Sequence, residues 1–198
     1  MTTERIKRIL INRVISPVYT SFRIAKYWIL SSCSNVTGTP IRICPVLLNG
    51  VGTVIFKKSV TIGVVASPYF YNTYCYIEAR NSLSVVSFGD NVFINNNACF
   101  ISEGEGIYIG ADVLIGPSVT IFDSDFHAID PLKRKLEKKT ARVQIEDNVF
   151  IGANVTILKG VTIGKNSVIA SNSLVSKSIP ANVIAGGNPC KIIKEISV

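Results

Sequence analysis

Histidine is almost absent from this chain of 198 residues, which has a single one, at position 127. A zinc site built on histidines needs several imidazoles, so a metal site of that kind is nearly excluded. Cysteine offers no substitute, because the five cysteines are an odd number without CxxC or CxxH spacing. We therefore expect no metal and no disulfide framework, which suits a protein of the reducing cytoplasm.

Charged residues are also few, at 17% of the chain, while apolar residues make up 47%. This balance excludes a disordered chain, and the length suits one domain with a small extension. No clean apolar run precedes a small-residue cleavage site, and basic residues interrupt any membrane span near the N-terminus. We expect neither a signal peptide nor a transmembrane helix.

The charge that is present is mostly positive, giving a net charge of +8, and it is unevenly placed. Residues 1–30 hold six basic residues against one acidic residue, and residues 128–142 hold six against two. Such clusters attract phosphates, acidic glycans or anionic lipid headgroups. The alternative is that both are solvated surface segments.

A period of six residues dominates the C-terminal half. From residue 145 to residue 178 an aliphatic residue recurs at every sixth position, and this period suits a triangular coil with one short strand and one turn per side. The aliphatic residue then points inward on every side of a parallel β-helix. These positions are Ile145, Ile151, Ile157, Ile163, Ile169 and Val175.

The residues between these positions suit the corners of such a coil. The position after the aliphatic residue is small, as at Gly152, Gly164 and Ala170, because the chain turns there. Asparagine suits a corner that needs a left-handed backbone. It recurs at Asn148, Asn154, Asn166 and Asn172.

The pattern is less regular toward the N-terminus. Between residues 46 and 87 the inward positions expected are Val51, Ile62, Ile77 and Leu83, which do not hold one register, as is common where a repeat is capped. The register tightens over residues 88–98, slips through residues 102–106 and resumes at Ile109. It stops again at His127, where a basic insertion of residues 128–143 begins. An insertion does not improve a regular coil, so we expect a functional site there.

Residues 1–45 precede the repeats and predict a helical segment followed by a linker. We expect two short amphipathic helices on either side of Pro17, because proline disfavours a helix interior. Their mixture of basic and aromatic residues is typical of a helix on the inner membrane surface. The alternative is that they pack on the repeats of the same or a neighbouring subunit.

These motifs resemble the hexapeptide-repeat acyltransferases, most closely the galactoside and maltose acetyltransferases and the capsule or exopolysaccharide O-acetyltransferases. The resemblance covers residues 88–195 and rests on the hexads, on Asp-Ser-Asp-Phe-His at 123–127 and on Ala-Gly-Gly-Asn-Pro-Cys-Lys-Ile-Ile-Lys at 185–194. It implies a mainly β fold, a left-handed parallel β-helix over residues 46–184. It also implies a helical segment and linker over residues 1–45, the inserted loop, and a C-terminal cap over residues 185–198.

The resemblance also implies catalytic residues. His127 matches the family's catalytic histidine, a general base that takes the proton of the attacking hydroxyl. Its ring needs an orienting partner, for which Asp125 and Asp123 are the nearest carboxylates and a backbone carbonyl is the alternative. Asn95 falls where galactoside-type enzymes place an active-site asparagine, although it is also explained as part of an ordinary turn.

In the resembling enzymes coenzyme A lies in a groove between two prisms of a homotrimer. Phe150 falls where many relatives carry tryptophan. Lysines of the C-terminal tail stand where those enzymes use arginines near the nucleotide phosphates. The matching cofactor-binding positions are Ala153, Ser171, Ser176, Lys177, Lys191 and Lys194.

We therefore expect an acetyl-CoA-dependent O-acetyltransferase that acts on a sugar hydroxyl of a cell-surface polysaccharide or its precursor. The basic loop would bind an acidic acceptor, the protein would be cytoplasmic or lie at the inner face of the membrane, and no nucleic acid is expected as a partner. Three alternatives remain: an amino-sugar N-acetyltransferase, a serine O-acetyltransferase and a non-catalytic trimeric β-helix scaffold. The loop residues expected to bind the acidic acceptor are Lys133, Arg134, Lys135, Lys138 and Lys139.

Overall fold

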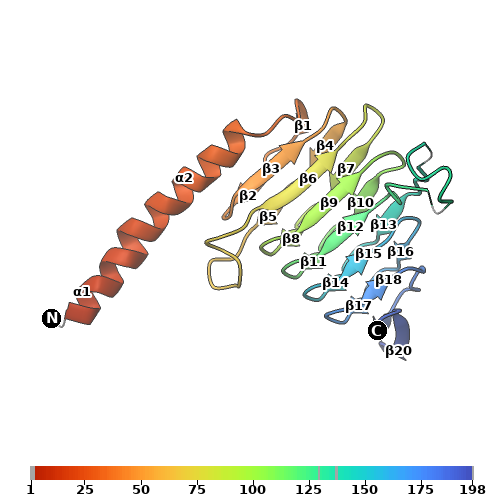
Figure 1. Ribbon diagram of the computed structural model, residues 1–198. Helices are drawn as coiled ribbons and strands as arrows, with labels where there is room; N and C mark the ends of the chain where they lie inside the picture. Colours follow the sequence, from red (N-terminus) through yellow and green to blue (C-terminus); the bar gives the residue numbers. More distant parts are fainter. Residues whose placement is uncertain (1–2, 129, 137, 198) are drawn as a thin grey trace.

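The computed structural model describes residues 3–128, 130–136 and 138–197, and shows a three-sided prism of short parallel strands with one long helix at its N-terminal end (Figure 1). Residues 129 and 137 of the expected basic loop lie outside the described residues. Through the body of the prism each strand pairs in parallel with the strand three further along the chain, so successive strands belong to successive faces. The repeat therefore winds as a coil of three sides.

The three faces are three sheets. The first sheet contains β1 (Asn35–Thr37), β4 (Thr53–Phe56), β7 (Val85–Phe88), β10 (Ile107–Ile109), β13 (Val143–Ile145) and β16 (Thr162–Ile163). The second sheet contains β2 (Ile41–Arg42), β5 (Thr61–Ile62), β8 (Phe93–Ile94), β11 (Leu114–Ile115), β14 (Phe150–Ile151), β17 (Val168–Ile169), β19 (Val183–Gly186) and β20 (Lys191–Glu195). The third sheet contains β3 (Val46–Asn49), β6 (Cys75–Ala79), β9 (Cys99–Ser102), β12 (Thr120–Phe122), β15 (Thr156–Ile157) and β18 (Leu174–Val175).

The predicted inward positions of the regular coils are confirmed. All six aliphatic residues of the hexads are fully buried, and they stack in register with the coil before them, as Ile121 pairs with Ile157 and Ile115 with Ile151. Each coil thus adds one aliphatic side chain per face to a continuous core.

The corners also follow the prediction. Asn148, Asn154, Asn166 and Asn172 have φ angles of 55–61°, the left-handed region that asparagine tolerates. Their side chains bond from coil to coil, as the Asn148 amide donates to Asn166 Oδ1 at 3.0 Å. A Cβ on Gly164 would stand 2.3 Å from the Ala181 nitrogen, so a larger residue would push the coils apart at that corner.

The N-terminal coils show where the spacing misleads. The coil begins already at β1, ahead of residue 46, and Ile62 and Ile77 are buried as expected. Val51 and Leu83 are 64% and 84% exposed, so their prediction as inward residues is wrong. Both lie in turns of irregular length between strands, where the count of six no longer tracks the inner face.

The N-terminal helix is continuous: α1 (Thr3–Leu10), the π-helical turn η1 (Ile11–Ile15) and α2 (Ser16–Ile29) follow without a break. The predicted interruption at Pro17 is therefore wrong. The Ser16 N–H bonds to the Ile11 carbonyl five residues back, and this wide turn accommodates a proline that lacks a donor. In the described part of the chain, no helix combines the length and apolar character needed to cross a bilayer.

The C-terminal end of the prism is closed by an antiparallel pair. β19 pairs in parallel with β17, and β20 then turns back and pairs with β19, as expected for a capping segment (Figure 1). After the third face the regular coil is interrupted between β12 and β13, where the inserted segment, the described part of residues 123–142, stands out from the prism (Figure 1).

Candidate active site

The inserted segment leaves the prism through a short antiparallel ribbon. The main chain of Ser124 forms an antiparallel bridge with Thr140. Beside it, the Asp125 N–H donates to the Lys139 carbonyl oxygen at 3.1 Å, and the Ala141 N–H donates to that of Asp123 at 2.9 Å. These bonds fix where the segment begins, and so where His127 is held.

Asp123 ties this ribbon to the neighbouring coil. Its carboxylate is fully buried and accepts a hydrogen bond from Ser102 Oγ at 2.7 Å. It also accepts from the main-chain N–H groups of Glu103, Gly104 and Gly106 at 2.7, 3.1 and 2.8 Å. With both oxygens occupied in this way, Asp123 does not serve as the carboxylate that orients His127.

Glu103 is the second anchor of the segment. Its buried carboxylate accepts from Arg80 Nη1 at 2.7 Å, from Lys138 Nζ at 2.8 Å and from Ser124 Oγ at 2.6 Å. Burial opposes ionisation, but the hydrogen bonds from Lys138, Ser124 and Arg80 outweigh it and lower the pKa of Glu103 to about 2. Lys138 therefore holds the loop in place, a structural role in addition to the expected contribution to acceptor binding.

Phe126, the residue before His127, is held from two sides. Its backbone is left-handed, with a φ angle of 58°, and its ring lies edge-on to that of Phe122 with centroids 5.1 Å apart. The guanidinium of Arg80 lies 5.4 Å from the centroid of the same ring. The packing of Phe126 thus fixes the direction of the backbone that leads to His127.

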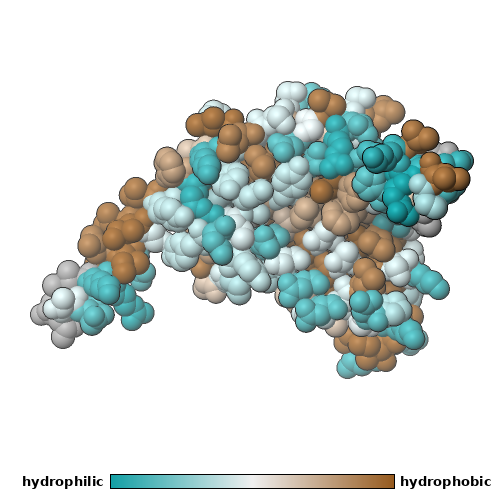
Figure 2. Space-filling view, viewed as in Figure 1, coloured by the Kyte–Doolittle hydropathy of each residue, from teal (hydrophilic) through white to brown (hydrophobic). Residues whose placement is uncertain are grey.

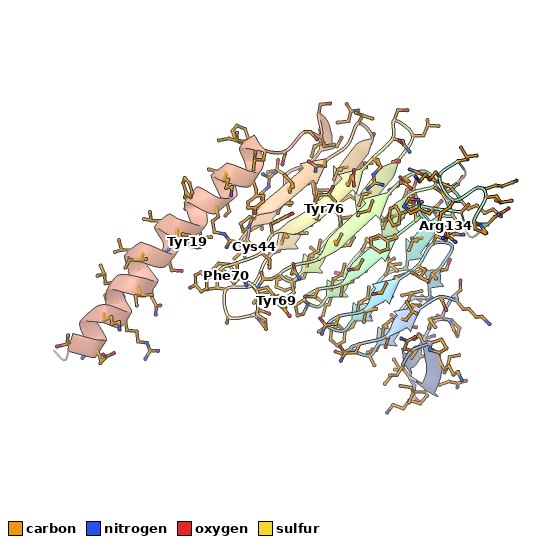
Figure 3. All side chains as sticks on the ribbon, viewed as in Figure 1. Tyr19, Cys44, Tyr69, Phe70, Tyr76 and Arg134 are labelled. Carbon is orange, nitrogen blue, oxygen red and sulfur yellow. The ribbon has the colours of Figure 1, made fainter. Side chains whose placement is uncertain are left out.

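His127 is exposed at the rim of a pocket of about 370 Å³ formed with Pro131, Leu132, Arg134 and Lys135. Its Nδ1 lies 3.3 Å from the carbonyl oxygen of Arg134, which stands out on the inserted loop in Figure 3. A carbonyl only accepts, so in the neutral ring this contact favours the tautomer with its proton on Nδ1, which leaves Nε2 as the nitrogen that can accept one. The orienting partner is thus the backbone carbonyl rather than a carboxylate.

Asp125 is placed differently from the expectation. Its carboxylate lies 3.5 Å from Lys159 Nζ, and only its main-chain oxygen meets His127, accepting the His127 N–H at 2.6 Å. Asp125 therefore shapes the turn that carries the histidine and does not contact the ring.

The remaining predicted residues fall on two different edges of the prism. Asn95, Ala153 and Ser171 lie one above another on the edge between the second and third sheets, where the Ala153 N–H donates to Ser171 Oγ at 3.1 Å. His127, Ser176 and Lys177 follow strands of the third sheet and lie on its other edge. One copy of the chain therefore does not bring Asn95 to His127.

Asn95 is half-buried, and its side chain accepts the N–H of Asn96 at 2.7 Å. The neighbouring Asn96 is the buried asparagine, and it bonds to the main chain of Val64 and Pro68. Lys191 and Lys194 are exposed on β20, and Phe150 is 47% exposed on the second sheet. Lys191, Lys194 and Phe150 are thus accessible to a ligand or to another subunit.

The spacing of the sequence does not reveal the charged network formed by Glu78, Arg80, Glu103 and Lys138. Arg80 bonds to both carboxylates, at 2.8 Å to Glu78 and 2.7 Å to Glu103. The one signal for it was the slip of register at residues 102–106, where a polar loop replaces an inward aliphatic residue.

A family model described as "Bacterial transferase hexapeptide (six repeats)" matches residues 142–177. A galactoside O-acetyltransferase of Lactococcus lactis is 42% identical over 113 residues, which are 57% of this chain and 54% of that protein. The matched part of the chain thus spans about half the length of this curated relative.

Solved structures match over more of the chain. A hexapeptide-repeat acetyltransferase of Vibrio cholerae complexed with acetyl coenzyme A is 28% identical, with a TM-score of 0.57, and covers 90% of this chain and 78% of its own. The polySia-specific acetyltransferase NeuO is 29% identical, with a TM-score of 0.58 and coverage of 84% and 70%. This similarity confirms the left-handed parallel β-helix expected from the resemblance.

Proposed function

Because the chain belongs to the hexapeptide-repeat acetyltransferases, we propose that it transfers the acetyl group of acetyl-CoA to a hydroxyl group of a sugar. The observation that carries this proposal is the placement of His127. The loop holds it at the rim of a pocket, with Nδ1 turned to a backbone carbonyl and Nε2 left to accept a proton.

The proposed reaction uses His127 as a general base. Nε2 takes the proton of the sugar hydroxyl as its oxygen attacks the thioester carbonyl carbon, and the C–S bond breaks as the tetrahedral intermediate collapses. The same proton then passes from Nε2 to the departing thiolate of coenzyme A. The intermediate carries a negative oxygen, for which the Asn95 amide of a second copy is the proposed donor.

A homotrimer would complete this site. Since Asn95, Ala153 and Ser171 lie on one edge of the prism and His127, Ser176 and Lys177 on another, a groove between two prisms would join the two sets. We propose that coenzyme A binds in this groove, with Lys191 and Lys194 near its phosphates. Sedimentation should give about three times 21.5 kDa, and a fully active stable monomer would contradict the shared site.

The proposed acceptor is an acidic cell-surface polysaccharide or its precursor. The basic loop beside His127 supports this choice, as does the similarity to a polySia-specific enzyme.

The five cysteines are free, and burial raises the pKa of Cys44 and Cys99 to about 11, so these two thiols are poorly reactive. A reducing cytoplasm is the proposed compartment.

The test is a thiol-release assay with acetyl-CoA and a panel of acceptors. Release that depends on a neutral or acidic sugar supports the proposal, whereas release only with an amino sugar or with serine would point to another acceptor class. Absence of release with every acceptor would favour a non-catalytic scaffold.

A further inference from the structure

The N-terminal helix turns its polar side to the prism. The buried Arg23 guanidinium donates to the carbonyl oxygens of Phe70 and Thr73, in the loop that rises from the second face. Nearby, Ser16 Oγ lies 2.9 Å from Tyr71 Oη, and Tyr19 lies against the same loop (Figure 3). Hydrogen bonds thus fix the helix across the end of the prism.

Its apolar side is left facing solvent. Val18, Phe22, Trp28 and Ile29 are 65–72% exposed, far more than apolar side chains that pack on their own domain. Figure 2 shows this apolar surface as a brown band along the projecting helix. The other exposed apolar residues of the helix are Ile9, Leu10, Ile11, Val14 and Ile15.

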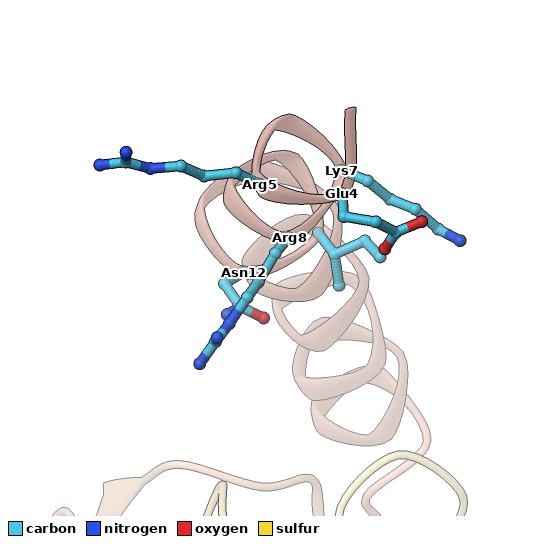
Figure 4. Close-up of a pocket in the computed structure, with 6 residues that line it drawn as sticks. Glu4, Arg5, Lys7, Arg8 and Asn12 are labelled. Atoms are coloured by element: carbon cyan, nitrogen blue, oxygen red, sulfur yellow. The ribbon is translucent and has the colours of Figure 1, made fainter. Parts of the chain in front are cut away.

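Positive charge accompanies this apolar surface. Arg5, Lys7, Arg8 and Arg13 lie on the same helix, and Glu4 is its one acidic residue. In the close-up of Figure 4 the side chains of Arg5, Lys7 and Arg8 fan out around the first turns of the helix. Basic side chains beside exposed apolar and aromatic ones are the combination that anionic bilayers bind.

We propose that the helix of residues 3–29 docks the protein flat on an anionic lipid bilayer. Because the polar side is bonded to the prism, the helix axis would lie in the membrane plane and the apolar side would enter the headgroup region. The charge favours this occupant over a second copy of the same helix, since two such helices would bring their cations together. The active-site loop would remain on the water side, near the opposite half of the prism (Figure 1).

The test is flotation of the full-length protein with vesicles of phosphatidylcholine, with or without phosphatidylglycerol. Wild type should float with the anionic vesicles and much less with the neutral ones. Val18→Asp with Phe22→Asp should lower the partition coefficient by roughly tenfold or more, because two side chains lose their apolar insertion. The matched control is Ile192→Asp with Ile193→Asp, which changes two exposed apolar residues on β20 at the other end of the prism.

The charge is tested separately with Arg5→Gln, Lys7→Gln and Arg8→Gln together. Partitioning to anionic vesicles should fall by roughly fivefold per charge removed, and added salt should weaken the wild type in the same direction. Lys57→Gln, Lys58→Gln and Lys165→Gln remove as many exposed charges from the prism and should have a smaller effect.

Two results would overturn the proposal. One is wild type that fails to float with anionic vesicles. The other is a Val18→Asp, Phe22→Asp variant that floats like wild type but loses a larger oligomer in sedimentation, which would make the face a contact between copies. Vesicle binding does not depend on acetyl transfer, so a failed thiol-release assay would leave this test unaffected.

Discussion

The regular coils of residues 145–178 and the inserted segment of residues 123–142 are stabilised by different forces. In the coils every hexad buries an aliphatic side chain against the one a turn before it, so the same contact repeats. The inserted segment is held by Asp123, by the ion pairs of Glu103 and by the packing of Phe126. A repeating core provides a rigid platform, and polar contacts at one interruption position the chemistry on it.

The largest effect expected from either region is on catalysis, at His127. His127→Ala should lower kcat by roughly 10²–10⁴, the usual contribution of a general base, because this is the only imidazole of the chain. The side chain is exposed, so the thermal unfolding midpoint should stay close to that of wild type. Steady-state thiol release and calorimetry measure the two quantities.

His127→Asn is the matched variant, since it keeps a polar side chain and removes the proton acceptor. It should be as inactive as His127→Ala while still binding coenzyme A. Near wild-type turnover in either variant would make His127 structural.

The regular coils should respond in the opposite way. Ile163→Ala leaves a cavity in the repeating core and should lower the free energy of unfolding by about 2–5 kcal/mol, with kcat little changed below the melting transition. Leu83→Ala, at a side chain that is 84% exposed, is the control and should cost little. If urea denaturation gave the same loss of unfolding free energy for both variants, the buried aliphatic residues of the hexads would not be the source of the stability.

A smaller effect is expected at Glu103, which links the two regions. Glu103→Gln keeps the shape but weakens the charged hydrogen bonds from Arg80 and Lys138, which should lower the free energy of unfolding by about 1–3 kcal/mol at neutral pH. It should also lower kcat, because Lys138 and Ser124 position the loop of His127.

The pH dependence of this loss of stability tests whether the charge of Glu103 causes it. The pKa of Glu103 is lowered to about 2, so its ionised form stabilises the fold above its unfolded pKa of roughly 4.3. This contribution is lost as the pH falls from that value towards 2. The stability difference between wild type and Glu103→Gln should therefore shrink over that range in urea denaturation, and a constant difference would contradict the assignment.

The regular coils could be predicted from the sequence, whereas the irregular turns and the continuous N-terminal helix could not. Ile151 and Asn154 were placed correctly because each occupies one position of a repeated unit and the neighbouring units confirm it. The predictions for Val51 and Leu83 are wrong because turns of irregular length interrupt the six-residue spacing. The prediction for Pro17 is wrong because a wide helical turn accommodates the proline without ending the helix.

In the site, the interruption of the repeat predicts the position of His127, and a backbone carbonyl is one of the expected partners, but the sequence does not say which carbonyl. The nearest carboxylates in the sequence, Asp123 and Asp125, bond to the 102–106 loop and to Lys159, and the folded loop brings the Arg134 carbonyl instead. Such contacts join residues across coils and depend on the three-dimensional path of an irregular segment, for which spacing gives no rule.

The smallest effect expected is on acceptor binding, and it divides the lysines of the inserted segment into two kinds. Lys135 and Lys139 are exposed, whereas Lys138 bonds to Glu103. Lys135→Gln with Lys139→Gln should raise the KM for an acidic glycan by severalfold, leave the KM for acetyl-CoA unchanged and weaken the salt dependence, because two positive charges that attract the acceptor are lost.

Lys138→Gln should instead lower kcat more than it raises the acceptor KM, because it loosens the anchor that positions His127 while removing the same charge. Steady-state kinetics with an acidic acceptor and with a neutral acceptor of the same length separate the two effects, since only the acidic one feels the lost attraction of Lys135 and Lys139. If all three lysine changes gave the same kinetic pattern, the anchor and the acceptor surface would not be distinct, and the polar contacts of the inserted segment would not position the chemistry as proposed.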